Sequence, residues 1–220
     1  MSPRPTVSSY AILGLLALRP WTGYDLTRQA TRSLRFAWPK SERLLYSEPK
    51  KLVELGWATT QRETVDGRSR NVYEITSEGR DALEVWMTTR PGPPQLEAEA
   101  LLRVLFAEHG TGDDAKASLE ALRVDAREME DSVVAINASY LEGGHPFPDR
   151  THLSVLFATF QVEVFRLVQA WVDFASDEIE SWPDIKGVGR TDRVDELIVA
   201  MRDRRSLLAD EQPCEPGADP

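Results

Sequence analysis

The chain has 220 residues, of which 41% are hydrophobic and 28% charged, a composition typical of a folded soluble protein and unlike that of a disordered chain. A single cysteine, Cys214, excludes an intrachain disulfide, and the three histidines have no metal-ligand spacing, so we expect no metal and no cofactor. The net charge of −10 argues against nucleic acid as a partner until its distribution along the chain is considered.

Charge differs between the two parts of the chain. Residues 1–90 hold 14 Lys and Arg against 10 Asp and Glu, whereas residues 91–220 hold 12 against 26. The first part can therefore face phosphate groups, and the second part repels them and is better suited to assembly.

The first part begins with a pattern of three helices. The apolar run at residues 11–18 is too short to span a bilayer and lacks a signal-peptide cleavage site, so we interpret residues 9–18 as a buried first helix of a cytoplasmic protein. A second helix is expected from a cap at Thr22 to about Phe36, and a third from a cap at Ser41 to a stop at Gly56.

A hairpin and a fourth helix should follow. Two β-prone runs, residues 58–65 and 71–76, flank the sequence DGRSR and predict a two-stranded hairpin with a basic turn. Thr76 is positioned to cap a helix over residues 77–89. Together these elements predict a winged helix-turn-helix domain over residues 1–90, in which the third helix would enter the major groove of DNA.

The expected third helix contains a proline, Pro49, which in a helix interior costs roughly 3 kcal/mol. A helical wheel places Pro49 with Leu45, Leu52 and Val53 on the inner face, so that its ring fills an apolar slot. Two geometries are open. Either the helix bends at Pro49, or a second helix restarts there with Ser47 as its cap.

The outer face of the same helix is basic and polar. Arg43, Ser47, Lys50 and Lys51 lie there, where they could contact bases and phosphates, although most such faces are only solvated. With the neighbouring positions that we discuss next, the candidate DNA contacts are Tyr24, Ser41, Arg43, Tyr46, Ser47, Lys50, Lys51, Arg68 and Arg70.

The remaining candidates lie outside the third helix. Arg68 and Arg70 in the expected hairpin turn suit the negative minor groove or its phosphates, or else they only keep the turn soluble. Tyr24, at the start of the second helix, is expected either to touch a phosphate or to be partly buried against the third helix.

A domain boundary is predicted at residues 90–95, RPGPPQ, which are too rich in proline and glycine to continue a helix. After it we expect an all-α, coiled-coil-like dimerisation domain over residues 96–210 and a disordered tail over residues 211–220. The helices of that domain are expected at residues 97–108, 113–141, 152–176 and 191–209.

Two of these helices have patterns that require partners. Residues 113–141 carry a heptad seam over about four heptads, which needs a neighbouring helix along its whole length. Residues 152–176 are apolar on nearly every side, so we expect them to be buried between layers or shared between subunits. Trp171 and Phe174 in this helix could line an effector pocket, although packing in a dimer core is the favoured interpretation.

A set of motifs within residues 9–88 occurs in a specific order and spacing: LGLL at 13–16, GYDL at 23–26, Trp38-Pro39, Tyr46…Leu52…Gly56, VYEIT at 72–76 and Gly79-Arg80. In these motifs the chain resembles the PadR family of transcriptional regulators. The rest resembles the longer members, whose C-terminal helical domain mediates dimerisation. Two departures stand out: Pro49, where many members have an aliphatic residue, and the length of the chain beyond Pro183.

The resemblance implies a mainly α fold, with a winged helix-turn-helix domain followed by a helical dimerisation domain. It also implies a homodimeric transcription factor, usually a repressor, that binds an inverted-repeat operator in double-stranded DNA. Members of the family often release DNA when a small aromatic or phenolic molecule binds.

Two other classes of function make different demands on the sequence. It has no glycine-rich phosphate loop, nucleophile elbow or ligand-spaced His/Glu set, so we do not expect an enzyme. The alternative is a winged-helix protein-interaction module without direct DNA readout, which would not need the basic side chains of the third helix and the wing. Binding to duplex DNA that falls steeply with salt separates these classes.

Overall fold

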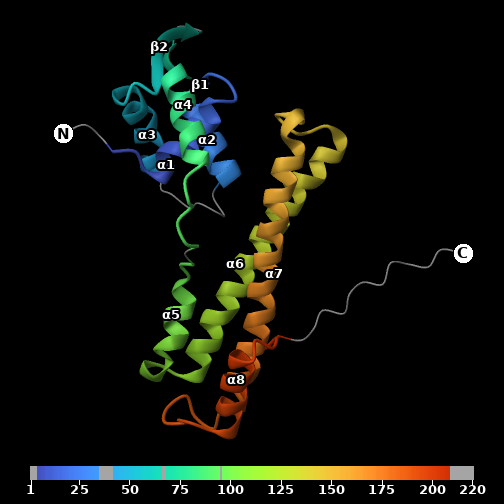
Figure 1. The fold of residues 1–220 in the computed structure, drawn as a ribbon. Coiled ribbons are helices and arrows are strands. Elements are labelled where there is room, and N and C mark those ends of the chain that lie inside the picture. The colour runs from blue at the N-terminus through green and yellow to red at the C-terminus, as the bar shows by residue number, and fades with distance from the viewer. Residues whose placement is uncertain (1–3, 35–41, 66–67, 95, 209–220) are drawn as a thin grey trace, which may run out of the picture. The chain divides into compact units, whose positions relative to one another are not determined.

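A computed structural model describes residues 4–34, 42–65, 68–94 and 96–208 of the chain. These residues form two compact units, divided between Pro94 and Gln95 (Figure 1). The first unit is mixed, with helices and a small sheet, and the second is helical. The fold is therefore mainly α, as the sequence predicts.

The first unit has the element order of a winged helix-turn-helix. It comprises α1 (Val7–Leu16), β1 (Trp21–Thr22), α2 (Gly23–Leu34), α3 (Glu42–Glu54), β2 (Ala58–Val65), β3 (Arg68–Ile75) and α4 (Ser77–Met87). The three helices, the hairpin and the fourth helix all lie close to their expected positions in the sequence.

Local capping explains where these helices begin and end. The Thr22 hydroxyl accepts from the backbone N–H of Asp25 at 3.1 Å, and the Thr76 hydroxyl accepts from that of Gly79 at 3.0 Å, as expected for N-caps. After α3, Gly56 takes a left-handed conformation, with φ of 76°, which ends the helix as predicted. Ser41, the predicted cap of α3, lies outside the described residues.

The sheet has three strands in the order β1-β3-β2, all antiparallel, so the expectation of a two-stranded wing was incomplete. The two-residue strand β1 pairs Trp21 with Tyr73 and is too short to show any alternation in the sequence. The hairpin strands are also longer than expected. Arg68 and Arg70 belong to β3, rather than to the turn, because the pairing with β2 continues to Val65.

Helices α1, α2 and α3 together form the core of the first unit. Ile12, Leu13 and Leu16 of α1 are almost completely buried, together with Leu26 of α2 and Leu52 of α3. Burial of aliphatic side chains from three helices fixes α3 against α1 and α2, which leaves the opposite face of α3 free.

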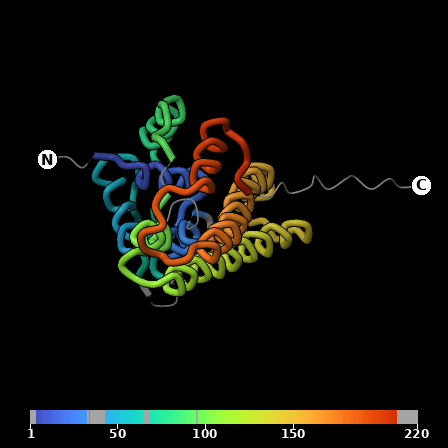
Figure 2. The backbone as a smooth tube through the Cα atoms, turned by 90° about the horizontal axis from the view of Figure 1, so that it is seen from below, coloured from blue at the N-terminus to red at the C-terminus, as the bar shows by residue number. Residues whose placement is uncertain are grey.

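The second unit consists of α5 (Glu99–Leu105), α6 (Gly112–Ala138), α7 (Thr151–Ser181) and α8 (Asp192–Arg202), with short 3-10 turns at Ala107–His109, Ser139–Glu142 and Pro148–Arg150. The long helices α6 and α7 lie side by side (Figures 1 and 2). They are antiparallel, because Glu130 pairs with Arg166 whereas the earlier Arg123 pairs with the later Asp173. α5 and α8 are shorter than the helices that we expected there.

The heptad seam of α6 packs against α7 of the same chain. Ala115, Leu119, Ala126 and Val133 of α6 are buried along this contact. On α7 the matching seam is Ala158, Gln161, Phe165, Val172, Ala175 and Ile179. The predicted partner helix therefore lies within the chain, as one arm of a helical hairpin.

The other apolar side of α7 is exposed in the part of the chain that the structure describes. Leu156 and Phe160 are 70% and 66% exposed, and Leu153, Phe157 and Leu167 are also exposed. By length and composition alone, Pro148–Ser181 is the one described helix that could cross a membrane. One side of this helix packs against α6 through the inner seam, and its second side is also apolar.

Two helical glycines should respond in opposite ways to alanine. A Cβ at Gly79 in α4 would collide with the backbone carbonyl of Trp57, whereas one at Gly14 in α1 would meet nothing within 4 Å. We therefore expect Gly79→Ala to lower the free energy of unfolding by about 1–3 kcal/mol through overpacking. Gly14→Ala should raise it by about 0.5–1 kcal/mol through helix propensity.

Urea unfolding of both variants, followed by far-UV circular dichroism, measures the two changes. Gly14→Ala is the matched control, because it makes the same chemical change in a helix of the same unit. A Gly79→Ala protein as stable as Gly14→Ala would contradict the close backbone approach between α4 and Trp57.

Candidate nucleic-acid interface

Helix α3 presents two chemically distinct faces, as the helical wheel predicts. Leu45, Pro49 and Leu52 are buried on the inner face. Arg43 and Lys50 are exposed on the outer face, together with the polar side chains Tyr46 and Ser47. A helix held on one side by the core and basic on the other can lie in a DNA groove without losing its packing.

The structure decides between the two geometries for Pro49. α3 is one helix from Glu42 to Glu54, and the Ser47 hydroxyl donates to the carbonyl oxygen of Leu44 at 2.8 Å. Ser47 therefore does not cap a second helix, and the restarted-helix alternative is wrong. A bend at Pro49 stays a prediction, since the proline cannot donate to the carbonyl of Leu45.

Glu48 of α3 was not identified from the sequence. It is 2% exposed, although a carboxylate is rarely buried so completely. The Ser9 hydroxyl of α1 donates to its Oε2 at 2.7 Å, and Lys51 Nζ lies 3.5 Å from its Oε1. The spacing contained the signal, because Glu48 is three residues after Leu45 and four before Leu52, both of them inner-face positions.

The two adjacent lysines of α3 consequently differ. Lys50 is exposed, whereas the Lys51 side chain is only 21% exposed and forms the ion pair with Glu48. The sequence predicts both as DNA contacts. The structure places Lys50 on the outer face and Lys51 at the edge of the inner face.

A second row of side chains lies on α2. Tyr24 is 64% exposed at the start of this helix, so it is not buried against α3. Arg28 and Arg32 follow at intervals of four residues and are also exposed. Side chains four apart share one face of a helix, so the three form a row, of which only Tyr24 was identified from the sequence.

The wing contributes a third group. Arg70 of β3 lies opposite Glu63 of β2 and pairs with it at 3.1 Å, with both side chains nearly half exposed. Such an exposed ion pair is worth at most about 1 kcal/mol, so Arg70 can exchange Glu63 for a phosphate at little cost. The Arg68 side chain lies outside the described part of the structure.

The two candidate effector residues lie in the second unit, on α7. Trp171 packs against a buried cluster that includes Ala115, Leu119 and Val172, and Phe174 is half-buried. Trp171 therefore packs within the chain itself, and packing in a dimer core stays a prediction.

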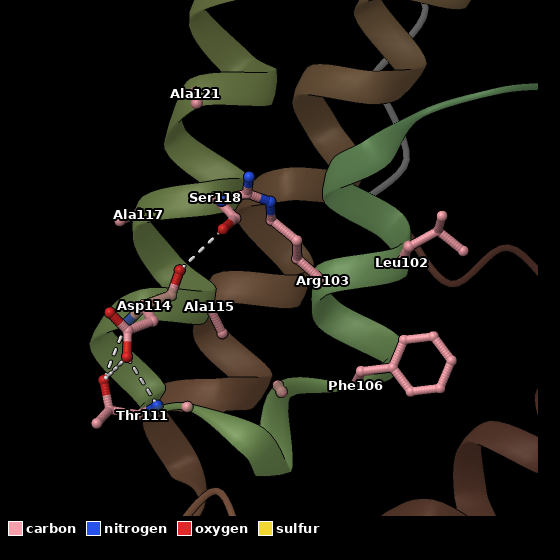
Figure 3. A pocket seen from close by; sticks show the side chains of 11 residues that line it. Leu102, Arg103, Phe106, Thr111, Asp114, Ala115, Ala117, Ser118 and Ala121 are labelled. Carbon is pink, nitrogen blue, oxygen red and sulfur yellow. Dashed lines mark hydrogen bonds between the residues drawn. The ribbon is translucent and has the colours of Figure 1, made fainter.

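A separate groove of about 640 Å³ lies between α5 and α6 (Figure 3). Neither Trp171 nor Phe174 lines it. In Figure 3, Leu102 and Phe106 point away from α6.

At the edge of this groove the Thr111 hydroxyl and backbone N–H donate to Asp114, which lowers the pKa of that carboxyl group. Among the described residues no group of three His, Cys, Asp or Glu side chains could hold a metal ion.

Comparison with known proteins finds one similar family and several similar structures. Residues 12–85, which contain α2, α3 and the wing, match the model of the Transcriptional regulator PadR-like family. The Negative transcriptional regulator PadR of Bacillus subtilis (strain 168) is 28% identical over 164 residues, which cover 71% of this chain and 90% of the relative.

Solved structures share the fold over most of the chain. The crystal structure of Bacillus subtilis PadR in complex with operator DNA has a TM-score of 0.68 at 22% identity and covers 80% of this chain and 99% of that one. The crystal structure of the same protein in complex with p-coumaric acid has a TM-score of 0.59 at 23% identity and covers 80% and 97%. The likeness thus extends through both units.

The unequal roles of the two lysines can be tested by unfolding. Lys51→Met removes the cation beside a buried carboxylate, so we expect the free energy of unfolding to fall by about 1–3 kcal/mol. Lys50→Met removes an exposed charge from the same helix and should change it by no more than about 0.5 kcal/mol. Urea titration measures both, and equal effects would mean that Glu48 does not depend on Lys51.

Proposed function

We propose that this protein binds a specific double-stranded DNA site as a homodimer and represses transcription from it, because residues 12–85 match the model of the PadR-like family of transcriptional regulators. The single observation that carries the proposal is the two-faced helix α3. Its inner face is fixed in the core, and its outer face presents Arg43, Ser47 and Lys50 to the surroundings.

The spacing of these side chains suits base reading. Arg43 and Lys50 are seven residues apart and therefore lie on one face of α3, about 10 Å apart along its axis. That length corresponds to about three base pairs at roughly 3.4 Å each. Arginine and lysine recognise guanine through O6 and N7, so these two residues are our candidates for sequence readout, with Ser47 between them. Ser41 and Tyr46 are assigned as additional contacts.

Contacts to the DNA backbone are assigned to the flanking elements. Tyr24, Arg28 and Arg32 form the row on α2, and Arg68 and Arg70 lie on β3 of the wing. Such contacts set the position of the protein on the duplex without reading its sequence. The acidic second part of the chain repels phosphate, so it favours approach of DNA through the first unit only.

The homodimer is proposed from the uncovered side of α7. Its exposed residues Leu153, Leu156, Phe160 and Leu167 follow one another at intervals of three, four and seven, which is a second heptad seam. Exposed apolar residues of α5, including Leu105 at 67%, add to the apolar surface of the unit. An exposed apolar stripe along a helix of this kind marks an interface in a soluble protein.

A second copy of the chain is the occupant that fits the function. A twofold dimer carries two α3 helices related by symmetry, and such a pair matches an inverted repeat with half-sites about one helical turn apart. Repression is proposed because the curated relative is a negative regulator. We place the protein in the cytoplasm and assign it no catalytic activity.

A small aromatic molecule is proposed as the effector. The support is the structure of the Bacillus subtilis relative with p-coumaric acid. In this chain Trp171 and Phe174 stay candidate contacts, because they are three residues apart on one side of α7 and neither is fully buried. Their packing within the chain means that an effector there would have to displace part of that packing.

Substitutions in α3 and in the wing should have different consequences. Arg43→Ala or Lys50→Ala should weaken binding to the preferred site by about 1–3 kcal/mol and relax the choice of base at one position. Arg70→Ala should weaken all sequences alike and reduce the salt slope by about 0.9 for each phosphate that the protein no longer neutralises. Lys186→Ala, an exposed cation of the second unit, is the control for net charge and should do neither.

Selection of duplexes from a random library, followed by salt titrations on the selected and random sequences, measures these effects. Wing variants that change the preferred sequence, while α3 variants do not, would reverse the assignment. Binding that is insensitive to salt for every protein would favour the protein-interaction module.

The dimer can be separated with one added charge. Phe160→Glu places a carboxylate on the uncovered seam of α7, and because the side chain is already 66% exposed the fold of the chain should be kept. We expect this variant to sediment as a monomer and to lose most of its operator affinity. Thr159→Glu adds the same charge at the exposed neighbouring position, about 100° around the helix, and should stay dimeric. A dimeric Phe160→Glu protein would rule out this surface as the interface.

A further inference from the structure

Glu48 is the one carboxylate buried among the described residues, and it belongs to the helix that we assign to base reading. A buried carboxylate is costly unless hydrogen bonds and an opposite charge compensate for lost water. Glu54 on the same helix is exposed, so an acidic side chain in α3 need not be buried as Glu48 is.

Its first partner comes from α1. The Ser9 hydroxyl accepts from the backbone N–H of Thr6 at 2.9 Å and donates to Glu48 Oε2 at 2.7 Å. Ser9 lies in the first turn of α1, at the positive end of the helix dipole. Oε2 therefore has a hydrogen-bond donor that comes from the first turn of α1.

Its second partner is Lys51. The Nζ atom lies 3.5 Å from Glu48 Oε1, and the Lys51 side chain is mostly covered. An ion pair with a buried member is weakened less by water and salt than an exposed one, such as Arg70 with Glu63. The ion pair between Lys51 and Glu48 is therefore less weakened by water and salt than the exposed pair between Arg70 and Glu63.

From this arrangement we propose that Glu48 is a positioning residue, which holds Lys51 at the side of α3 and withholds its charge from the DNA backbone. The proposal rests on the function proposed above. A phosphate contact by Lys51 would add affinity for every sequence equally, because phosphates carry no base identity. By withholding it, Glu48 leaves Arg43 and Lys50 to act through bases and keeps the ratio of specific to non-specific affinity high.

A purely structural role for Glu48, as a tie between α1 and α3, predicts a different outcome. Breaking such a tie changes stability but does not add a phosphate contact. The salt slope of DNA binding distinguishes the two roles, because each additional neutralised phosphate steepens it by about 0.9.

The test compares the wild type with Glu48→Gln, Lys51→Met, the double variant and Glu54→Gln, all as the full chain. Each is titrated with a random 30-base-pair duplex and with the duplex that the wild type selects, at several salt concentrations. Glu54→Gln is the matched control, since it removes one negative charge from an exposed position of the same helix.

We expect Glu48→Gln to steepen the salt slope by about 0.9, to bind the random duplex several-fold more tightly at low salt and to discriminate less between the two duplexes. Lys51→Met, the double variant and Glu54→Gln should keep the wild-type slope. A Glu48→Gln slope equal to that of Glu54→Gln overturns the proposal. A salt slope of Lys51→Met that is shallower than the wild-type slope by about 0.9 also overturns the proposal, because Lys51 would then already contact phosphate in the wild type.

A measurement without DNA keeps this inference separate from the proposed function. In the wild type, acetylation by an amine-reactive ester, followed by peptide mass spectrometry, should modify Lys51 several-fold more slowly than Lys50. In Glu48→Gln the two rates should become similar. Equal rates in the wild type overturn the inference even if DNA binding is as proposed. Shielded Lys51 in a wild type that binds no duplex overturns the proposed function instead, and with it the effect on DNA.

Discussion

The arrangement of this protein depends on one constraint, which is that α7 has two apolar seams, of which α6 covers one and the other is exposed among the described residues. The inner seam, with Phe165 and Val172 as buried members, is covered by α6. The outer seam, with Leu156 and Phe160, faces outward. Water contact along that outer seam is unfavourable, and in the proposed homodimer a second α7 from another copy removes it. Symmetry then supplies two reading helices, which is what an inverted repeat requires.

A second constraint acts inside the winged unit. In the proposed function, α3 must be fixed firmly enough to read bases and yet leave Arg43, Ser47 and Lys50 exposed. The inner face meets the first need through Leu45, Pro49 and Leu52 in the core and through Glu48 bound to Ser9. The same carboxylate occupies Lys51, so that packing and charge on α3 are linked through one residue.

Much of this could be predicted from the sequence where local chemistry decides the outcome. Thr22, Gly56 and Thr76 fix helix ends through hydrogen bonds or backbone conformation within a few residues, and the structure confirms all three. The two faces of α3 follow equally well from its period. The inner seam of α6 was also visible, although its spacing could not tell whether the partner helix belongs to the same chain.

Features that depend on distant partners were missed or misjudged. Strand β1 exists only because β3 provides a ladder for Trp21 and Thr22. The burial of Glu48 requires the hydroxyl of Ser9, 39 residues earlier, and the exposure of Tyr24 depends on how α2 packs. The restarted helix at Pro49 was wrong because a local rule, capping by Ser47, gave way to a continuous helix held by the core.

The central claim is that two copies joined through α7 place two α3 helices on one symmetric DNA site. Hydroxyl-radical footprinting of the full chain on its selected duplex tests this claim most directly. We expect two protected segments on each strand, related by twofold symmetry and about one helical turn apart. A single protected segment, with no symmetry-related partner at saturating protein, would contradict it.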